Sequence, residues 1–406
     1  MTKLKVVKRE GVFMKDKIVY FDNSATTHVD SKVLETMLPY FKDNFGNASS
    51  VYSIGRTSKK AIEESRQKVA DALDAEFREI YFTASGTESD NWAIKGILQA
   101  NEKKGRHIIT SSIEHPAVLE TCQHLEKEGF EVTYLPVDTD GLINLKELED
   151  AIREDTVLIS IMFANNEIGT IQPIKEIGEI AKSKGVYFHT DAVQAVGNIP
   201  ISVKDMNIDL LSLTAHKFYG PKGIGALYVK KGVKFKKFIH GGHQERNMRG
   251  STENVAGIVG LGTAIELATK NIKENSEKLM AMRDRIFQEI SQTIPYVRLN
   301  GHKEKRLPGN INFSFEFIEG EALLLMLDMK GICASSGSAC TSGSLDPSHV
   351  LLAIGLIHEI AHGSLRISLG KENTMEDVDY LMEVLPPIVQ RLRDMSPLYE
   401  KVRKER

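Results

Sequence analysis

Two neighbouring stretches decide the fold of this chain, HTDAVQAVGNIP (His189–Pro200) and IDLLSLTAHKFYGPKGIGALYVKK (Ile208–Lys231). The first stretch follows an apolar run, Val186–Phe188, and its polar residues include Asp191. The second contains an apolar run, Leu210–Leu213, and the polar residues after it include Lys217. Parallel strands that end in this way direct their polar residues to the same edge of a sheet, where open α/β folds bind ligands. We therefore expect a carboxylate and an amine to meet at one site.

An acid and an amine in this arrangement suit one cofactor in particular. Pyridoxal phosphate needs a lysine for its Schiff base and an aspartate beside its pyridine nitrogen. Taken singly, a lysine after a strand is usually a solvated surface residue, and an aspartate there is usually a turn former or a helix cap. Lys217, however, is followed by three glycines within Tyr219–Gly225, a tight backbone path that an exposed lysine does not need. The pair therefore predicts a pyridoxal phosphate site.

The composition is that of an ordinary globular enzyme and excludes several classes of protein. A length of 406 residues favours two domains. The net charge of −3 provides no basic field for nucleic acid, and no apolar run reaches the roughly 18–20 residues of a membrane span. The charged N-terminus lacks a secretory apolar core, so we expect a cytoplasmic protein. The three cysteines are too sparse for a disulfide framework and lack zinc-like spacing, so no metal site is expected.

The two expected domains differ in their pattern. Residues 18–260 alternate apolar runs with helical segments, which predicts an α/β domain whose mostly parallel sheet is covered on both faces. Residues 261–406 predict a smaller α+β domain, with 1–17 as an N-terminal extension and 18–30 packing against the small domain. Residues 255–293 are predicted as one long helical run. The seven predicted strands are Glu79–Thr83, His107–Thr110, Val132–Leu135, Val157–Met162, Val186–His189, Leu210–Thr214 and Gly225–Val229.

A loop suited to an anion precedes one of the predicted helices. The sequence TASGTES (Thr83–Ser89) leads into a helix N-terminus, which offers backbone N–H groups and a positive dipole end. Gly86 and Thr87 lie in this loop. Because the Walker and dinucleotide glycine patterns are missing, the monophosphate of a cofactor fits best. The alternative is an ordinary helix start with Thr87 as the N-cap.

Further polar residues follow other predicted strands at the same edge. His115 could stack on a planar ring, although a lone histidine is more often a structural hydrogen-bonding residue. Asn166 could donate to a phenolic oxygen, although asparagine is also common in turns. Gln194 lies three positions after Asp191, on the same side of a helical turn. The amine of Lys217, once an amino-acid substrate displaces it from the cofactor, is placed to move the substrate's Cα proton.

Two residues of the C-terminal domain suggest the reaction. Cys340 lies in SSGSACTSGS (Ser335–Ser344), which is too small and polar to pack in a core and predicts a mobile loop over about residues 335–345. A cysteine on such a loop is able to react, and a tolerated surface thiol is the alternative. Arg366 lies inside a predicted strand, where either a clamp on a substrate carboxylate or a structural ion pair would explain its burial.

With these motifs, the chain resembles the pyridoxal-phosphate-dependent cysteine desulfurases, class V aminotransferases of the iron–sulfur cluster assembly and nitrogen-fixation type. The resemblance extends from Ile18 to about Tyr399 and implies a fold-type I homodimer with its site between subunits. It also implies L-cysteine as substrate and an iron–sulfur cluster scaffold protein as sulfur acceptor. The matching motifs are YFDNSATTHVD, FGNASSVYSIGR, TASGTESDNWAIKG, EHPAVLE, NNEIG, HTDAVQ, HKFYGPKG, RGSTENV, SSGSACTSGS and SLRISLG.

The resemblance implies a role for each candidate residue. Lys217 would bind the cofactor covalently, Asp191 would pair with the pyridine nitrogen, and His115 would stack on the ring. Cys340 would attack the substrate sulfur and leave as a persulfide, with alanine as the other product. The remaining residues would bind phosphate (Gly86, Thr87, Thr214, His216 and, from the partner subunit, Thr252), the phenolic oxygen (Asn166, Gln194) or the substrate (Arg366, Asn166 and either Asn23 or the Ala25 backbone).

Two other functions are alternatives at the level of sequence. A selenocysteine or cysteine-sulfinate lyase needs the same cofactor residues but depends much less on Cys340. A non-enzymatic partner in cluster assembly would need only a docking surface, such as the ending RLRDMSPLYEK (Arg391–Lys401), which resembles a scaffold-docking tail. The presence of both Asp191 and Lys217 argues against this second alternative.

Overall fold

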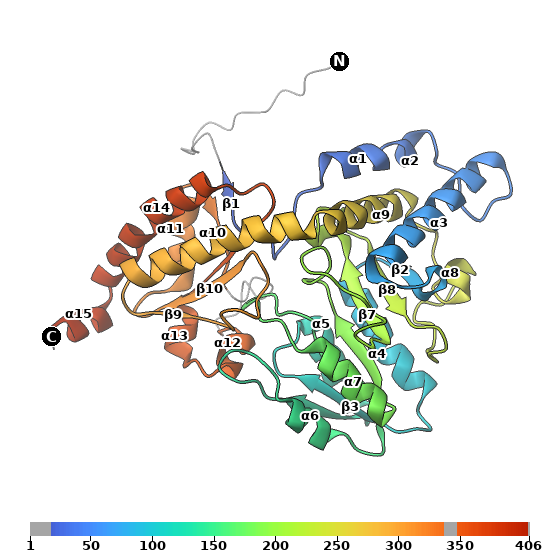
Figure 1. Ribbon diagram of the computed structural model, residues 1–406, viewed down its shortest axis with the longest axis horizontal. Helices are drawn as coiled ribbons and strands as arrows, with labels where there is room; N and C mark the ends of the chain where they lie inside the picture. Colours follow the sequence, from blue (N-terminus) through green and yellow to red (C-terminus); the bar gives the residue numbers. More distant parts are fainter. Residues whose placement is uncertain (1–17, 337–346, 405–406) are drawn as a thin grey trace.

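The computed structural model describes residues 18–336 and 347–404, and its larger part is built on a seven-stranded sheet (Figure 1). In order across the sheet, the strands are β2 (Ile80–Thr83), β8 (Gly225–Val229), β7 (Leu210–Thr214), β6 (Tyr187–Asp191), β5 (Thr156–Ser160), β3 (His107–Ser111) and β4 (Glu131–Leu135). Strand β8 is antiparallel to both of its neighbours, and all other neighbouring strands pair in parallel. The mostly parallel sheet predicted from the sequence is confirmed.

Helices cover both faces of this sheet. They are α3 (Ser53–Leu73), α4 (Gly86–Ala100), α5 (Pro116–Lys127), α6 (Leu145–Ala151), α7 (Ile174–Lys184) and α9 (Val255–Lys270). Because alternate strand residues point to opposite faces, Leu211 and Leu213 of β7 pack on the face covered by α3, α6, α7 and α9. Leu210 packs on the other face, among residues of α4 and α5. With both faces covered, the strand ends are the place where polar residues gather.

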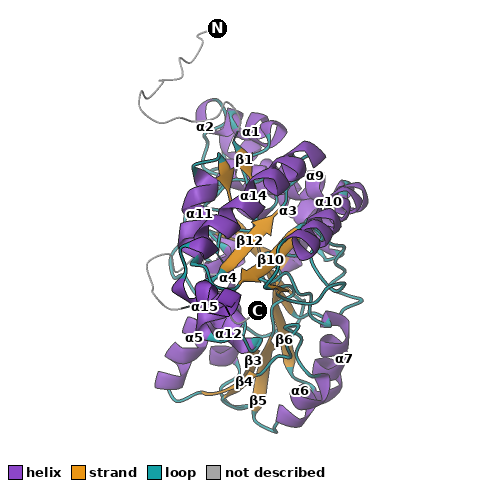
Figure 2. Cartoon of the chain, turned by 90° about the vertical axis from the view of Figure 1, so that its left-hand side faces the viewer, coloured by secondary structure: helices purple, strands orange, loops and turns teal. Residues whose placement is uncertain are grey.

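The C-terminal part has a separate core around a three-stranded antiparallel sheet, which Figure 2 shows above the large sheet. The strands of this sheet are β12 (Ser364–Ser368), β10 (Asn310–Phe315) and β9 (Val297–Leu299). The helices packed on it are α10 (Ile272–Thr293), α11 (Gly320–Asp328) and α14 (Met375–Asp394). Phe313 of β10 and Ile367 of β12 are buried in this core with Ile286 of α10 and Leu381 of α14.

The chain passes from the large core to the small one at Asn271, between two helices that follow one another across the top of Figure 1. Leu261 of α9 packs in the large core, whereas Leu279 of α10 packs in the small core. The long helical run predicted over residues 255–293 is therefore confirmed except for an interruption at Asn271, where the hydrophobic core also changes. Asparagine favours such a helix end because its side chain competes for backbone hydrogen bonds.

The first described residues belong to the small core although they begin the chain. Strand β1 (Val19–Tyr20) pairs in parallel with β11 (Ile332–Cys333), and Val19 and Phe21 are buried among small-core residues. The remaining helices are α1 (Ser31–Met37), α2 (Pro39–Lys42), α8 (Gln244–Asn247), α12 (His349–Ala353), α13 (His358–His362) and α15 (Pro397–Lys404), with short 3₁₀ turns η1 (Phe77–Glu79) and η2 (Ala215–Lys217). Within 18–336 and 347–404, no helix is long and apolar enough to cross a membrane.

Candidate active site

A cavity of about 440 Å³ lies at the carboxyl ends of the parallel strands, where the sequence predicts the site. Both parts of the chain form its walls, because Arg366 and His349 of the C-terminal part line it together with residues of the large sheet. The predicted site residues that line it are Ala25, Gly86, Thr87, His115, Asn166, Asp191, Gln194, Thr214, His216, Lys217 and Arg366. The structure thus brings together residues from widely separated segments.

Lys217 ends the η2 turn directly after β7. Its Nζ donates to the carbonyl oxygens of Ser24 at 2.6 Å and Ala25 at 2.8 Å. The turn that follows needs a glycine, because a Cβ on Gly220 would lie 2.6 Å from the Cβ of Ala215. The amine is therefore held in the cavity wall by its surroundings and is not a solvated surface group.

Asp191 ends β6 and is buried in the wall of the same cavity. Its Oδ1 accepts a hydrogen bond from the backbone N–H of Val193 at 2.9 Å. Burial raises the pKa of Asp191, and the charges of His115 and Lys217 oppose that rise. A cationic group beside the carboxylate would favour its charged form. The site therefore suits a protonated ring nitrogen.

The anion loop begins helix α4 with Ser85, not Thr87, as its N-cap. Ser85 Oγ accepts from the backbone N–H of Glu88 at 3.1 Å, so the alternative prediction for Thr87 is wrong and Thr87 instead lines the cavity from the first turn. A Cβ on Gly86 would lie 2.7 Å from Cγ2 of Val193, so only glycine fits without a shift. A helix N-terminus that can be approached this closely is suited to a phosphate.

Two histidines of the cavity are held as neutral rings. His115 is the N-cap of α5, and its Nδ1 accepts from the backbone N–H of Ala117 at 3.1 Å, which places the ring proton on Nε2. Burial lowers the pKa of His115. Burial and the charge of Lys217 lower the pKa of His216 to about 4, and its Nδ1 lies 3.1 Å from Oγ1 of Thr26. Neutral rings are suited to stacking and hydrogen bonding.

Arg366 is only 2% exposed, and two of its nitrogens are occupied. One Nη donates to Oδ1 of Asp22 at 2.8 Å and the other to the carbonyl oxygen of Asn166 at 3.1 Å. Its Nε has no hydrogen-bond partner among the described residues. The structural ion pair considered from the sequence is present, and these two bonds use only part of the five N–H donors of the guanidinium.

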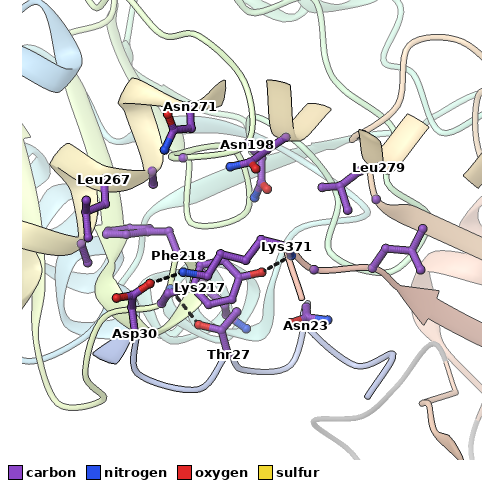
Figure 3. Close-up of a pocket in the computed structure, with 18 of the residues that line it drawn as sticks. Asn23, Thr27, Asp30, Asn198, Lys217, Phe218, Leu267, Asn271, Leu279 and Lys371 are labelled. Atoms are coloured by element: carbon purple, nitrogen blue, oxygen red, sulfur yellow. Dashed lines mark hydrogen bonds and ion pairs between the residues drawn. The ribbon is translucent and has the colours of Figure 1, made fainter. Parts of the chain in front are cut away.

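Two predicted residues lie apart from this cavity, and a third falls outside the described residues. Asn23 lines a second cavity, of about 270 Å³, which Lys217 and Phe218 also border (Figure 3). The Nδ2 of Asn23 donates to the carbonyl oxygen of Ser368 at 2.9 Å, whereas Ala25 lines the first cavity and its backbone N–H donates to the carbonyl oxygen of Asp22 at 3.0 Å. Thr252 is exposed and lines a separate cavity beside β2. Cys340 lies outside the described residues.

Sequence analysis missed several acidic residues of the cavity wall. Asp90 and Glu114 are each 1% exposed, and one carboxyl oxygen of each has no hydrogen-bond partner in the described chain. Burial raises the pKa of Glu114 to about 8 and that of Glu167 to about 7. His349, also missed, lies with its Nε2 3.0 Å from the carbonyl oxygen of Glu114. The sequence marks these acidic residues only by their position, since Glu114 precedes His115 and Glu167 follows Asn166.

Comparison with known proteins agrees with this geometry. The family model described as aminotransferase class-V matches residues 19–381. Cysteine desulfurase IscS of Clostridium botulinum is 62% identical over 393 residues, covering 96% of this chain and 99% of that protein. Cysteine desulfurase IscS of Methanosarcina thermophila is 64% identical over 392 residues, 97% of either chain. A solved NifS-like protein superposes with a TM-score of 0.87 at 42% identity, covering 93% of this chain and all of that one.

The chain belongs to the cysteine desulfurase family. Enzymes of this class use pyridoxal phosphate, and the cavity of this desulfurase fits that cofactor. The N-terminus of α4 would hold the phosphate, Asp191 would face the ring nitrogen and Lys217 would form the covalent bond, and all three line this one cavity. The backbone at Gly86 also fits a phosphate, because the missing Cβ, which would lie 2.7 Å from Cγ2 of Val193, leaves the loop N–H groups open to close approach.

Proposed function

We propose that this desulfurase converts L-cysteine to L-alanine and takes the sulfur onto Cys340 as a persulfide. In the overall reaction, the Cβ–S bond of the substrate breaks and an S–S bond to Cys340 forms. The proton of the Cys340 thiol ends on the Cβ of alanine, and the substrate's own thiol proton stays on the terminal sulfur. The observation that supports the proposal most is the presence of Asp191, Lys217 and Arg366 in one buried cavity.

Each of these residues has contacts that suit a defined task. Bound pyridoxal phosphate supplies an electron sink for a carbanion at the substrate's Cα. Arg366, oriented by Asp22, lines the cavity and would bind the substrate carboxylate through guanidinium N–H groups that its two hydrogen bonds leave unused. Lys217, with its amine held at the carbonyl oxygens of residues 24 and 25, is the base that moves the Cα proton. His115 presents only Nε2–H in its neutral form, so it donates and does not accept a proton.

Cys340→Ser tests the central step. With L-cysteine and a thiol reductant, the wild-type enzyme is expected to release alanine and sulfide, whereas the variant loses this activity by about 10²-fold or more and keeps the visible absorbance of the bound cofactor. Cys333→Ser, at a partly exposed position of β11, is the matched control and should retain activity. Full activity of Cys340→Ser on L-cysteine would contradict the persulfide step and favour the selenocysteine or cysteine-sulfinate lyase.

We also propose a homodimer in which Thr252 completes the phosphate site of the partner subunit. Thr252 is exposed and does not line the cofactor cavity of its own chain. Large apolar side chains are exposed between α1 and the start of α3, and such patches mark interaction surfaces. They are Leu34, Leu38, Phe41, Phe45, Val51, Tyr52 and Ile54. Light scattering should give twice the chain mass of 45.3 kDa, and a monomer at micromolar concentration would contradict the dimer.

We propose an iron–sulfur cluster scaffold protein as the sulfur acceptor and the cytoplasm as the location. The C-terminal segment supports a docking role, because Met395 and Leu398 are 73% and 55% exposed near the end of the chain. Removing residues 397–406 should leave alanine release unchanged and lower the transfer of labelled sulfur to the scaffold. Equal transfer with and without the segment would remove it from the docking surface. Cell fractionation tests the location.

A further inference from the structure

The segment before Thr252 has an unusual backbone. Glu245, Arg246 and Asn247 have φ values of 46°, 57° and 67°, three consecutive left-handed residues that are not glycine. Left-handed conformations are unfavourable for residues with a Cβ, and they persist only where surrounding contacts fix them. Such strain requires strong contacts, and the structure has them on two sides.

The first set of contacts joins this segment to β2. The carboxylate of Glu245 accepts two hydrogen bonds from Arg66, each of 2.7 Å, and a third from the backbone N–H of Phe82 at 3.0 Å. Both charged side chains are almost fully buried, at 6% and 4% exposure. Arg246 donates to the carbonyl oxygen of Ile80 at 2.7 Å, and its guanidinium lies 4.1 Å from the centre of the Tyr81 ring. The segment is thus fixed to the strand that leads into the phosphate loop.

The second set joins the segment to the phosphate loop itself. Arg249 donates from Nε and Nη2 to the two carboxylate oxygens of Glu88, at 2.6 and 3.1 Å, with only 16% and 11% of the two side chains exposed. The same carboxylate accepts from the backbone N–H of Ala84 at 2.8 Å. Ala84 and Glu88 flank Gly86, so the carboxylate that Arg249 holds also joins the two ends of the anion loop.

Thr252 follows three residues after Arg249, so the contacts of residues 245–249 with β2 and the phosphate loop also restrict its position. It is exposed, and its hydroxyl has no hydrogen bond to the described residues. We infer that Arg249 is a positioning residue that acts across the dimer: by bonding to Glu88 it holds Thr252 in place for the phosphate of the partner subunit. This inference rests on the proposed dimer. Each phosphate loop is then mechanically joined to the residue that serves the other site.

Cofactor release from the holoenzyme measures the effect. Arg249→Gln should speed the loss of visible absorbance on dilution by about tenfold, the scale expected for one misplaced hydrogen bond to a charged group. Arg249→Lys keeps the ion pair with Glu88 and should release its cofactor more slowly than Arg249→Gln. The lysine variant also provides the test if the glutamine variant fails to fold. Arg153→Gln removes a more exposed pair, with Glu131 and Asp155, and should leave the release rate unchanged.

Heterodimers decide in which subunit Arg249 acts. Lys217→Ala makes one subunit invisible, since only a subunit with Lys217 gives the absorbance of the covalently bound cofactor. When Arg249→Gln and Lys217→Ala are on the same chain, the visible site belongs to the other chain and should release its cofactor fast. When the two changes are on different chains, the visible site receives Thr252 from a chain with Arg249 intact and should release at the wild-type rate.

The opposite pattern, or equal rates in the two arrangements, would overturn the inference and leave Arg249 as a local support of its own loop. Thr252→Ala in the same two arrangements separates this failure from a failure of the proposed dimer contact. If Thr252→Ala acts on the partner's site and Arg249→Gln does not, only the inference fails. If Thr252→Ala does not act on the partner's site, the contact between subunits fails and the inference with it.

Discussion

Replacing Glu114 by glutamine should stabilise the enzyme, although Glu114 is buried beside His115. The Oε1 of Glu114 accepts from the hydroxyl of Ser111 at 2.6 Å and from the backbone N–H of Met162 at 2.9 Å. A glutamine keeps that carbonyl oxygen in place, so both bonds survive. It also removes a group that can lose a proton, and this is the source of the expected gain.

The magnitude follows from the shift of the Glu114 pKa from 4.5 to about 8, caused first by burial. Below pH 4.5 the folded and unfolded states both hold the proton, and the substitution has no effect. Between pH 4.5 and 8 only the unfolded state gives up its proton, so the free energy of unfolding of the wild type falls by about 1.4 kcal/mol per pH unit. By pH 7 the glutamine variant should be more stable by about 3 kcal/mol.

Urea unfolding at pH 4.5, 6 and 7, with equal protein and cofactor concentrations, measures this difference. The expected result is a gap in the free energy of unfolding that is near zero at the lowest pH and widens upward. Glu114→Ala should be less stable at every pH, because Ser111 and Met162 lose their acceptor. Glu120→Gln, at an exposed position of α5, is the matched control and should change nothing. A gap that does not vary with pH would refute the reasoning.

Three further predictions concern the site and the small core. Gly86→Ala places a Cβ 2.7 Å from Val193 Cγ2 and should speed cofactor loss during dialysis by about tenfold. Asp191→Asn should lower desulfuration in steady-state assays by about 10²-fold or more while the cofactor stays bound, because the ring nitrogen loses its charged partner. Arg393→Met, at a 1% exposed position where the guanidinium donates to the carbonyl oxygens of residues 296 and 316, should lower the unfolding free energy by about 2 kcal/mol.

The sequence predicted the strands at the site because polar residues there interrupt apolar runs sharply. The bounds of β7 and β8 agree with the prediction, and Asp191 and Lys217 meet as expected. The predicted strand Val157–Met162 is displaced to Thr156–Ser160, because Ile161 and Met162 are buried without belonging to the ladder. An apolar run in the sequence predicts which residues are buried, but buried residues can continue past the last hydrogen-bonded residue of a strand.

Features that depend on long-range packing could not be read from local pattern. Nothing near Asn23 reveals that its amide is bonded to the carbonyl of Ser368, 345 positions away. The burial of Glu114 and Glu167 is equally hidden, since acidic residues are normally exposed. The direction of β8 is set by its pairing between β2 and β7, which no local periodicity encodes.

The pairing of β1 with β11 also bears on how the protein is made. All strands of the large sheet lie between residues 80 and 229, so that core can form while synthesis continues. Residues 18–21 leave the ribosome before every other strand of the structure, yet their partners in the small core come after residue 271. Ser24 and Ala25, which hold the amine of Lys217, follow directly on this first strand. Lys217 should therefore bind the cofactor only after the small core has been synthesised and has folded. The yellow colour of the bound cofactor would then show that a newly made chain has reached this stage.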